Sequence, residues 1–306
     1  MGCKGMTAAM GAAVACAVGA TACAPGGRAG EEGTGAPGGD SARDTGAAPV
    51  VVPPQGALLI TELYYAGAVP TAGIDRYYAD QFVTITNTGD GAVDLGGLVL
   101  GEVFGLAGRI NAGDTPNAEA ADPARITLQG AFRIPGAPGE RLLAPGASVR
   151  ICQDAANHAP YSPVESLDAP LEAFVDNGRG DLDNPRADNL EPLLFSGGSD
   201  WLWTVFGPSL VLLPGEAVAE PERARLDGWP VWRVPAAGLI DAVEALRSEN
   251  AADYKRLHPA LDAGFATVSG TYTGEALHRR SDGAGGFQDT NDSGADFTVA
   301  PPTIRP

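Results

Sequence analysis

The chain has 306 residues, of which 44% are hydrophobic, 42 are glycine and 25 are proline, and its formal net charge is −18. The apolar fraction excludes wholesale disorder, and the glycine and proline content favours short strands and tight turns over long helices. Because so acidic a surface repels phosphate backbones, we expect no nucleic-acid partner; the charge agrees with a solvated acidic surface or with cation binding.

Residues 1–22 are expected to be a lipoprotein signal peptide. Lys4 supplies a positive charge, and the almost uncharged run that follows is too short to span a bilayer comfortably. The residues before Cys23 resemble a bacterial lipobox, with Ala20 where leucine is usual. Cleavage there would leave Cys23 as a lipidated N-terminus that anchors the exported protein to a membrane of the cell envelope or outer surface. The alternative is an ordinary signal peptide that is cut near Ala22.

Residues 23–56 are rich in glycine, alanine and proline and are expected to form a disordered tether. Cys3 and Cys16 belong to the signal peptide and Cys23 would carry lipid, so Cys152 has no partner for an internal disulfide. This count excludes a cysteine zinc site. We interpret Cys152 as a small buried residue of a strand.

Residues 57–300 are expected to form one domain built mainly of strands, followed by a tail at residues 301–306. Runs of strand-forming residues predict strands at 58–65, 81–87, 93–100, 201–206, 210–213, 231–234, 239–243, 265–268 and 276–280. Glycines 96 and 97 predict a bend in the third of these. We interpret residues 101–138 and 157–192 as long insertions between strands, and we expect a short helix at 250–257 with Asn250 as its N-cap.

The order of several segments resembles a lamin-tail-type domain. The opening segments are ITELYY (residues 60–65) and DQFVTITNTGDGAVDLGGLVL (residues 80–100), and a Pro-Gly turn at residues 145–146 then leads into an apolar strand. The basic segment 278–280 precedes a closing Q-D-T-N-x-S-x-x-D-F signature at residues 288–297. The whole pattern resembles an uncharacterised, DUF4876-like group of bacterial exported lipoproteins. The resemblance implies an all-β, immunoglobulin-like antiparallel β-sandwich and an envelope location, and it brings no catalytic residues.

Calcium is one candidate ligand. Asp181, Asp183 and Asp188 lie close together in one predicted insertion, and hard oxygen ligands on a flexible loop suit Ca²⁺. The spacing does not match an EF-hand loop. The alternative is that these side chains bond the backbone of local turns, in which case the protein needs no cofactor.

A second acidic group lies in the closing signature. Asp289, Asn291 and Asp296 are again candidate calcium ligands. The resemblance to the lamin-tail-type family implies instead a structural role in a tight loop, through bonds to its backbone and pairing with Arg279 or Arg280.

Aromatic residues offer a second kind of binding surface. Trp229 and Trp232 flank Pro230 and are candidates for a platform that contacts a glycan or a protein partner. Trp201 and Trp203 are interpreted as core residues.

Catalytic motifs are absent from the sequence. None of the three histidines has an HExxH arrangement, and no phosphate-binding loop or nucleophile elbow is present. The sequence therefore favours a non-catalytic envelope lipoprotein with a β-sandwich binding or structural module. The alternative is a secreted hydrolase whose carboxylates converge in the long loops.

Overall fold

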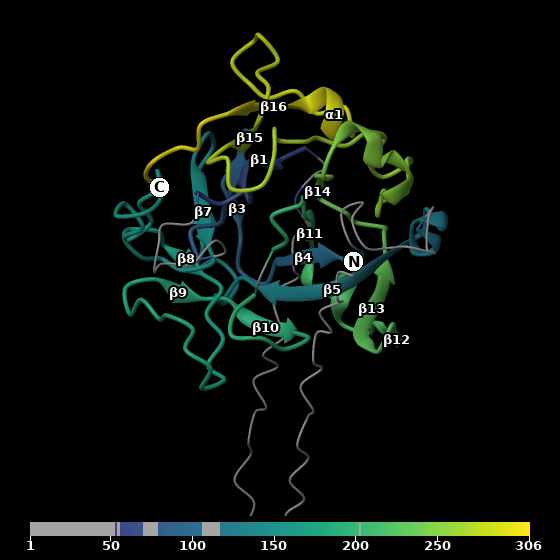
Figure 1. The fold of residues 1–306 in the computed structure, drawn as a ribbon, viewed down its shortest axis with the longest axis horizontal. Helices are drawn as coiled ribbons and strands as arrows, with labels where there is room; N and C mark the ends of the chain where they lie inside the picture. The colour runs from purple at the N-terminus through teal and green to yellow at the C-terminus, as the bar shows by residue number, and fades with distance from the viewer. Residues whose placement is uncertain (1–52, 54–55, 70–78, 106–116, 202) are drawn as a thin grey trace, which may run out of the picture. The chain divides into compact units, whose positions relative to one another are not determined.

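The computed structural model describes residues 53, 56–69, 79–105, 117–201 and 203–306 (Figure 1). The predicted signal peptide, Cys23 and nearly all of the predicted tether lie outside these residues. The contact pattern separates residues 1–47 from residues 48–306, and the second unit contains every strand described below. Within the described part of the chain, no helix is both long and apolar enough to cross a membrane.

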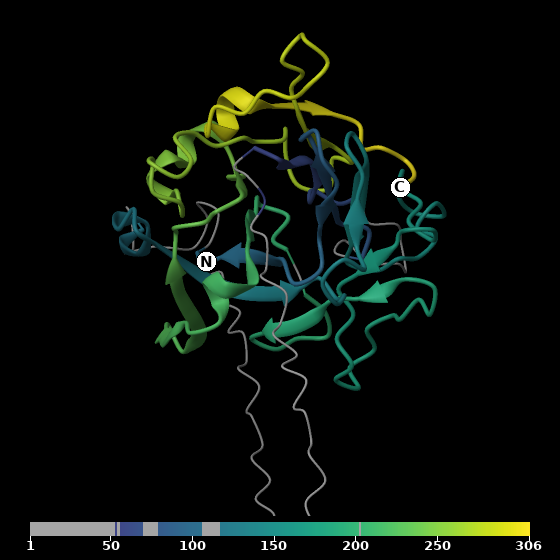
Figure 2. The same cartoon turned by 180° about the vertical axis from the view of Figure 1, so that it is seen from behind.

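Two large sheets account for most of the fold (Figures 1 and 2). The first has the order β16 (Phe297–Ala300), β15 (Ala276–Arg279), β1 (Leu58–Tyr64), β2 (Phe82–Asn87), β7 (Ser148–Cys152), β8 (Leu171–Glu172) and β9 (Asp188–Asn189). The second has the order β12 (Glu222–Leu226), β13 (Trp229–Pro235), β5 (Arg125–Arg133), β4 (Val99–Val103), β11 (Ser209–Leu213) and β14 (Asp241–Glu244), and β10 (Glu191–Leu194) also pairs with β5. A small ladder joins β3 (Val93–Asp94) to β6 (Leu142–Leu143).

The sheets bury a shared apolar core between them. Alternate residues of β1 and β2, such as Ile60 and Ile85, belong to the same buried cluster as Leu100 of β4 and Leu212 of β11. The strand period of two explains why these residues point inward together. The pairing is antiparallel except for two short parallel ladders, β7 with β8 and β8 with β9. The predicted all-β sandwich is therefore confirmed.

The long insertion after β7 covers one end of the first sheet. The outer faces of β1, β2 and β7 contribute Tyr64, Phe82 and Cys152 to a small buried cluster, and Ala169 and Ala187 of the insertion complete it. Cys152 is a free, buried cysteine, as predicted. This cover brings loops that are distant in sequence together at the edge of the sheet.

Several predicted elements differ from the structure. Residues 101–138 are not one insertion, because they contain the nine-residue central strand β5. The predicted strand at 93–100 is split into β3 and β4 at the glycine bend. Residues 201 and 203–206 and residues 265–268 form no strand, although Trp201 and Trp203 are buried and Ala266 makes a single bridge to Ala245.

The helical elements are short. The predicted helix at 250–257 is the 3-10 segment η3 (Glu249–Tyr254), and the residue at its N-cap is Ser248 instead of Asn250. The other short elements are η1 (Ala118–Ala121), η2 (Gly215–Val218) and α1 (Ser293–Asp296). Strands β12 and β16 were not expected from the sequence, and neither were β8, β9 and the start of β10, which lie within the predicted insertion at residues 157–192.

Candidate metal centre

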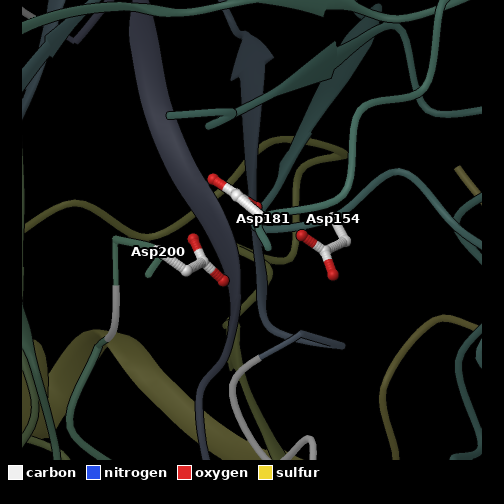
Figure 3. A group of neighbouring side chains, drawn as sticks. All are labelled: Asp154, Asp181 and Asp200. Atoms are coloured by element: carbon white, nitrogen blue, oxygen red, sulfur yellow. The ribbon is translucent and has the colours of Figure 1, made fainter. Parts of the chain in front are cut away.

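Three aspartates from separate segments converge beside the first sheet. Asp154 follows β7, Asp181 lies in the loop between β8 and β9, and Asp200 lies in the loop between β10 and β11. One carboxylate oxygen from each residue lies within 4.8 Å of the other two. Figure 3 shows the three carboxylates gathered around one space.

These carboxylates are largely removed from water, and one oxygen of each lacks a hydrogen-bond partner among the described residues. The exposed fractions of Asp154 and Asp200 are 4% and 3%, and Asp181 is half-buried. In each residue the Oδ1 atom is buried and has no hydrogen-bond partner among the described residues. Burying a charged oxygen in this way is strongly unfavourable unless a cation or a proton compensates it.

Hydrogen bonds with the backbone hold the three segments in place, and the Asn177 side-chain amide donates to the Gly198 carbonyl in the loop of Asp200 at 2.9 Å. The second oxygen of Asp181 accepts a hydrogen bond from the Val175 amide at 2.6 Å. The backbone amide of Asp154 donates to the Ala79 carbonyl at 3.2 Å. The arrangement therefore belongs to the folded loops and does not depend on attraction among the three carboxylates, which repel one another.

A fourth carboxylate organises the surrounding insertion. Glu172, at the end of β8, is fully buried and accepts hydrogen bonds from the backbone amides of Ala155 at 2.8 Å and Asn184 at 2.7 Å. Burial raises the pKa of Glu172. It is a structural neighbour of the cluster, and both of its oxygens already have amide donors.

The environment raises the pKa of all three clustered aspartates. Burial raises the pKa of Asp154 to about 9, and the charges of Asp200 and Asp181 add to the effect. Burial, followed by the charge of Asp181, raises the pKa of Asp200 to about 7, and burial also raises the pKa of Asp181. At neutral pH the cluster must therefore hold protons or a metal ion.

The donor set fits a hard divalent cation. Carboxylate oxygens bind Ca²⁺ at about 2.3–2.6 Å, so two oxygens on opposite sides of the ion are roughly 4.8 Å apart. The separations among the three oxygens fall within that span. The group contains no imidazole or thiolate, which are the nitrogen and sulfur ligands typical of zinc sites.

The structure places the three predicted calcium ligands in different environments. Asp181 belongs to the cluster, but Asp183 accepts a hydrogen bond from the Asn189 side chain at 2.9 Å, and Asp188 forms an ion pair with Arg141. The predicted trio is therefore not assembled. The other two members of the cluster were missed, because each is a lone aspartate in its own loop and no spacing rule relates them.

The closing loop places Arg279 among several carboxylates. The Arg279 guanidinium lies 2.6 Å from Asp241, 3.3 Å from Asp289 and 3.8 Å from Asp296. Asp296 also accepts hydrogen bonds from the backbone amide and hydroxyl of Thr290, at 2.8 and 2.7 Å. Asp241 was not expected from the sequence as a partner.

The remaining residues of the closing loop act through the backbone. The Asn291 carbonyl accepts a hydrogen bond from Ala263, and Asn291 adopts a left-handed conformation with φ of 53°. The Arg280 amide donates to the Asp296 carbonyl.

The two candidate tryptophans do not form one platform. Trp229 is 55% exposed at the β12–β13 hairpin, whereas Trp232 is 8% exposed and belongs to the core cluster on the outer side of the second sheet. Residues three apart on a strand point to opposite faces, which explains the difference. The expectation of a surface position is wrong for Trp232.

The comparisons with known proteins identify a family. Residues 144–303 match the family described as protein of unknown function (DUF4876). The chain belongs to the DUF4876 family. A comparison with curated proteins gives no match. The crystal structure of a DUF4876 family protein from Bacteroides thetaiotaomicron VPI-5482, at 2.50 Å resolution, is similar with a TM-score of 0.69 and 27% identity, covering 79% of this chain and 70% of that chain.

Proposed function

We propose that this DUF4876 chain is a lipid-anchored protein of the bacterial cell envelope whose β-sandwich head is a non-catalytic module that binds calcium. The observation that carries the calcium assignment is the set of three buried, unpartnered oxygens of Asp154, Asp181 and Asp200. A bound ion would cross-link the loop after β7, the β8–β9 loop and the β10–β11 loop, in addition to the short ladders that already pair β7, β8 and β9.

Several features support a structural or binding role over hydrolysis. The cavities that open beside β14, β1 and β16 are lined by residues other than the three clustered aspartates. A hydrolytic carboxylate must reach a bound substrate, and the Oδ1 atoms of the three clustered aspartates are buried. The exposed Trp229 supports a glycan or protein partner at the β12–β13 hairpin.

Thermal unfolding tests the calcium site. If calcium at 100 times its dissociation constant contributes about 2.7 kcal/mol, the melting temperature of a domain of this size should rise by roughly 5–10 °C. An Asp154→Asn variant should lose the shift, and the matched control Asp183→Asn should keep it. A wild-type melting curve that does not change in millimolar Ca²⁺ would remove the site.

The lipid anchor rests on Cys23 and the small residues before it. We expect the wild-type chain to fractionate with membranes of a bacterial host, and a Cys23→Ser variant to be recovered in the soluble fraction. Continued membrane association of the variant would contradict the anchor while leaving the calcium proposal untouched.

A further inference from the structure

The outer face of the first sheet carries buried polar side chains where an antiparallel sheet usually meets water. Val83, Ile85 and Ile151 face the inter-sheet core, so Thr84 of β2 and Arg150 of β7 point to the opposite side. Arg150 is nevertheless only 3% exposed. Residues 301–306 cover part of this outer face of the first sheet.

Arg150 and Glu62 hold this tail through its main chain. The Arg150 Nη2 group donates to the carbonyl oxygens of Thr303 at 2.9 Å and Arg305 at 3.1 Å. The Glu62 carboxylate accepts a hydrogen bond from the Thr303 amide at 2.7 Å. A β-bulge between Ile60 and Glu62 sets the register of β1 at this point.

Two further contacts also bind the main chain of residues 301–306. The Glu165 amide donates to the Ile304 carbonyl at 2.8 Å, and His278 Nε2 donates to the Pro301 carbonyl at 2.9 Å. The side chain of Ile304 is exposed. These contacts recognise an extended backbone, and Pro302 is the buried residue among residues 301–306.

Residues 301–306 lie in a groove on the outer face of β1, β2, β7 and β15, and they leave part of it open. A cavity of about 560 Å³ remains beside it, lined by residues of β1, β2, β7 and β15 and by Arg305. The Nε and Nη1 groups of Arg150 and the hydroxyl of Thr84 have no hydrogen-bond partner among the described residues. The guanidinium lies 3.7 Å from the centre of the Phe82 ring, which fixes its orientation.

We propose that this groove is a binding site for an extended, proline-containing segment of a partner polypeptide, and that residues 301–306 occupy it in cis. Pro301 and Pro302 favour an extended conformation and need no amide donor, so such a segment loses little entropy on binding. A tethered occupant competes at millimolar effective concentration, and a partner must displace it. The inference is independent of the calcium site and of the lipid anchor.

A loosened tail tests the proposal in the full mature chain. The probe is a fluorescein-labelled peptide with the sequence of residues 300–306, APPTIRP, followed by fluorescence anisotropy. Thr303→Pro removes the amide that binds Glu62, so the variant should bind the peptide at least about tenfold more tightly than the native chain, as expected for loss of one charge-assisted hydrogen bond in cis. Thr303→Ser keeps the amide and should bind within about twofold of native.

A second substitution tests the groove itself. Adding Arg150→Lys to the Thr303→Pro chain should weaken peptide binding at least about tenfold, because lysine lacks the planar guanidinium that stacks on Phe82 and holds Nη2 between the two carbonyls. A peptide N-methylated at its threonine should bind poorly, and APPSVRP should bind as well as APPTIRP.

Three results would overturn the proposal. The first is a folded Thr303→Pro chain, with native circular dichroism, that gains no peptide affinity. The second is strong dependence on the threonine or isoleucine side chain. The third is dimerisation on gel filtration without peptide binding, which would make a second copy the occupant. If Thr303→Pro does not fold, hydrogen exchange of the Thr303 amide is measured in the native chain. Excess peptide should accelerate this exchange, because a displaced tail no longer bonds to Glu62. An unchanged exchange rate would contradict the proposal.

Discussion

Two groups of acidic residues in this protein differ in how their charge is compensated. In the closing loop the chain supplies the cation, because Arg279 reaches Asp241, Asp289 and Asp296. In the insertion the chain supplies three carboxylates and, among the described residues, no hydrogen-bond donor to their Oδ1 atoms. The first group is complete as folded, and the second requires protons or an external ion.

The pKa values show the same contrast. Burial raises the pKa of Asp241 to about 7, and the charge of Arg279 opposes the rise. For Asp154 burial is again the main cause, but the neighbouring charges act in the same direction and the pKa reaches about 9. Similar burial therefore gives different chemistry, depending on the sign of the nearest charge.

The largest expected effect comes from removing the internal cation. Arg279→Met should lower the free energy of unfolding by roughly 3–5 kcal/mol, because Asp241 then remains buried without its partner. Urea unfolding in the presence and absence of Ca²⁺ measures the loss, which should be the same in both conditions. A loss below about 1 kcal/mol would show that Arg279 is not the compensating charge.

Neutralising one carboxylate in each group should have opposite consequences. In chelator at pH 8, Asp296→Asn should destabilise by roughly 2–3 kcal/mol, since Asp296 accepts bonds from Thr290 and lies beside Arg279. Asp200→Asn should stabilise by roughly 1–2 kcal/mol, because it removes a repelling buried charge. Equal destabilisation by Asp296→Asn and Asp200→Asn would show that the charges of the two groups are compensated in the same way.

The stability of the ion-free chain should depend on pH. The folded pKa values of Asp154 and Asp200 lie above the ordinary value of 3.8. The folded state therefore holds more protons than the unfolded state from about pH 4 to pH 9, and stability falls as pH rises through this window. Urea unfolding at pH 6.5 and pH 8 should show a drop of roughly 2–3 kcal/mol in chelator and a smaller drop in saturating Ca²⁺. A rise in chelator would contradict the assignment.

The smallest effects should come from the exposed aspartates of the same insertion. Asp183→Asn and Asp188→Asn should each change stability by less than about 0.5 kcal/mol, with the Ca²⁺ response preserved, because exposed polar contacts contribute little. Loss of the Ca²⁺ response in these two variants would favour the set of ligands predicted from the sequence.

Sequence reasoning predicted the fold better than the site, and particular residues show why. Strands such as β1 and β2 carry their signal within one short segment, where alternation and flanking turns are visible. The central strand β5 was hidden in a polar, glycine-rich stretch, although ITLQGAFRI within it alternates. The pairing in the closing loop could also be predicted, since Arg279 and its partners Asp289 and Asp296 are close in sequence.

The metal centre could not be read in the same way. Asp154, Asp181 and Asp200 lie in three loops, and only the register of the strands between them brings the carboxylates together. Asp181 was selected for its neighbours in sequence, which turned out to have other partners. A site assembled across loops leaves no spacing that a single sequence can reveal.

Calorimetric titration of Ca²⁺ into the chelator-treated mature chain at pH 7.5 tests whether Asp154, Asp181 and Asp200 bind calcium. We predict one calcium ion bound per chain, with proton release that appears as a dependence of the heat on the buffer, and loss of binding in both Asp154→Asn and Asp200→Asn. Absence of binding to the wild-type chain, or binding that survives in both variants, would contradict a calcium site at these three aspartates.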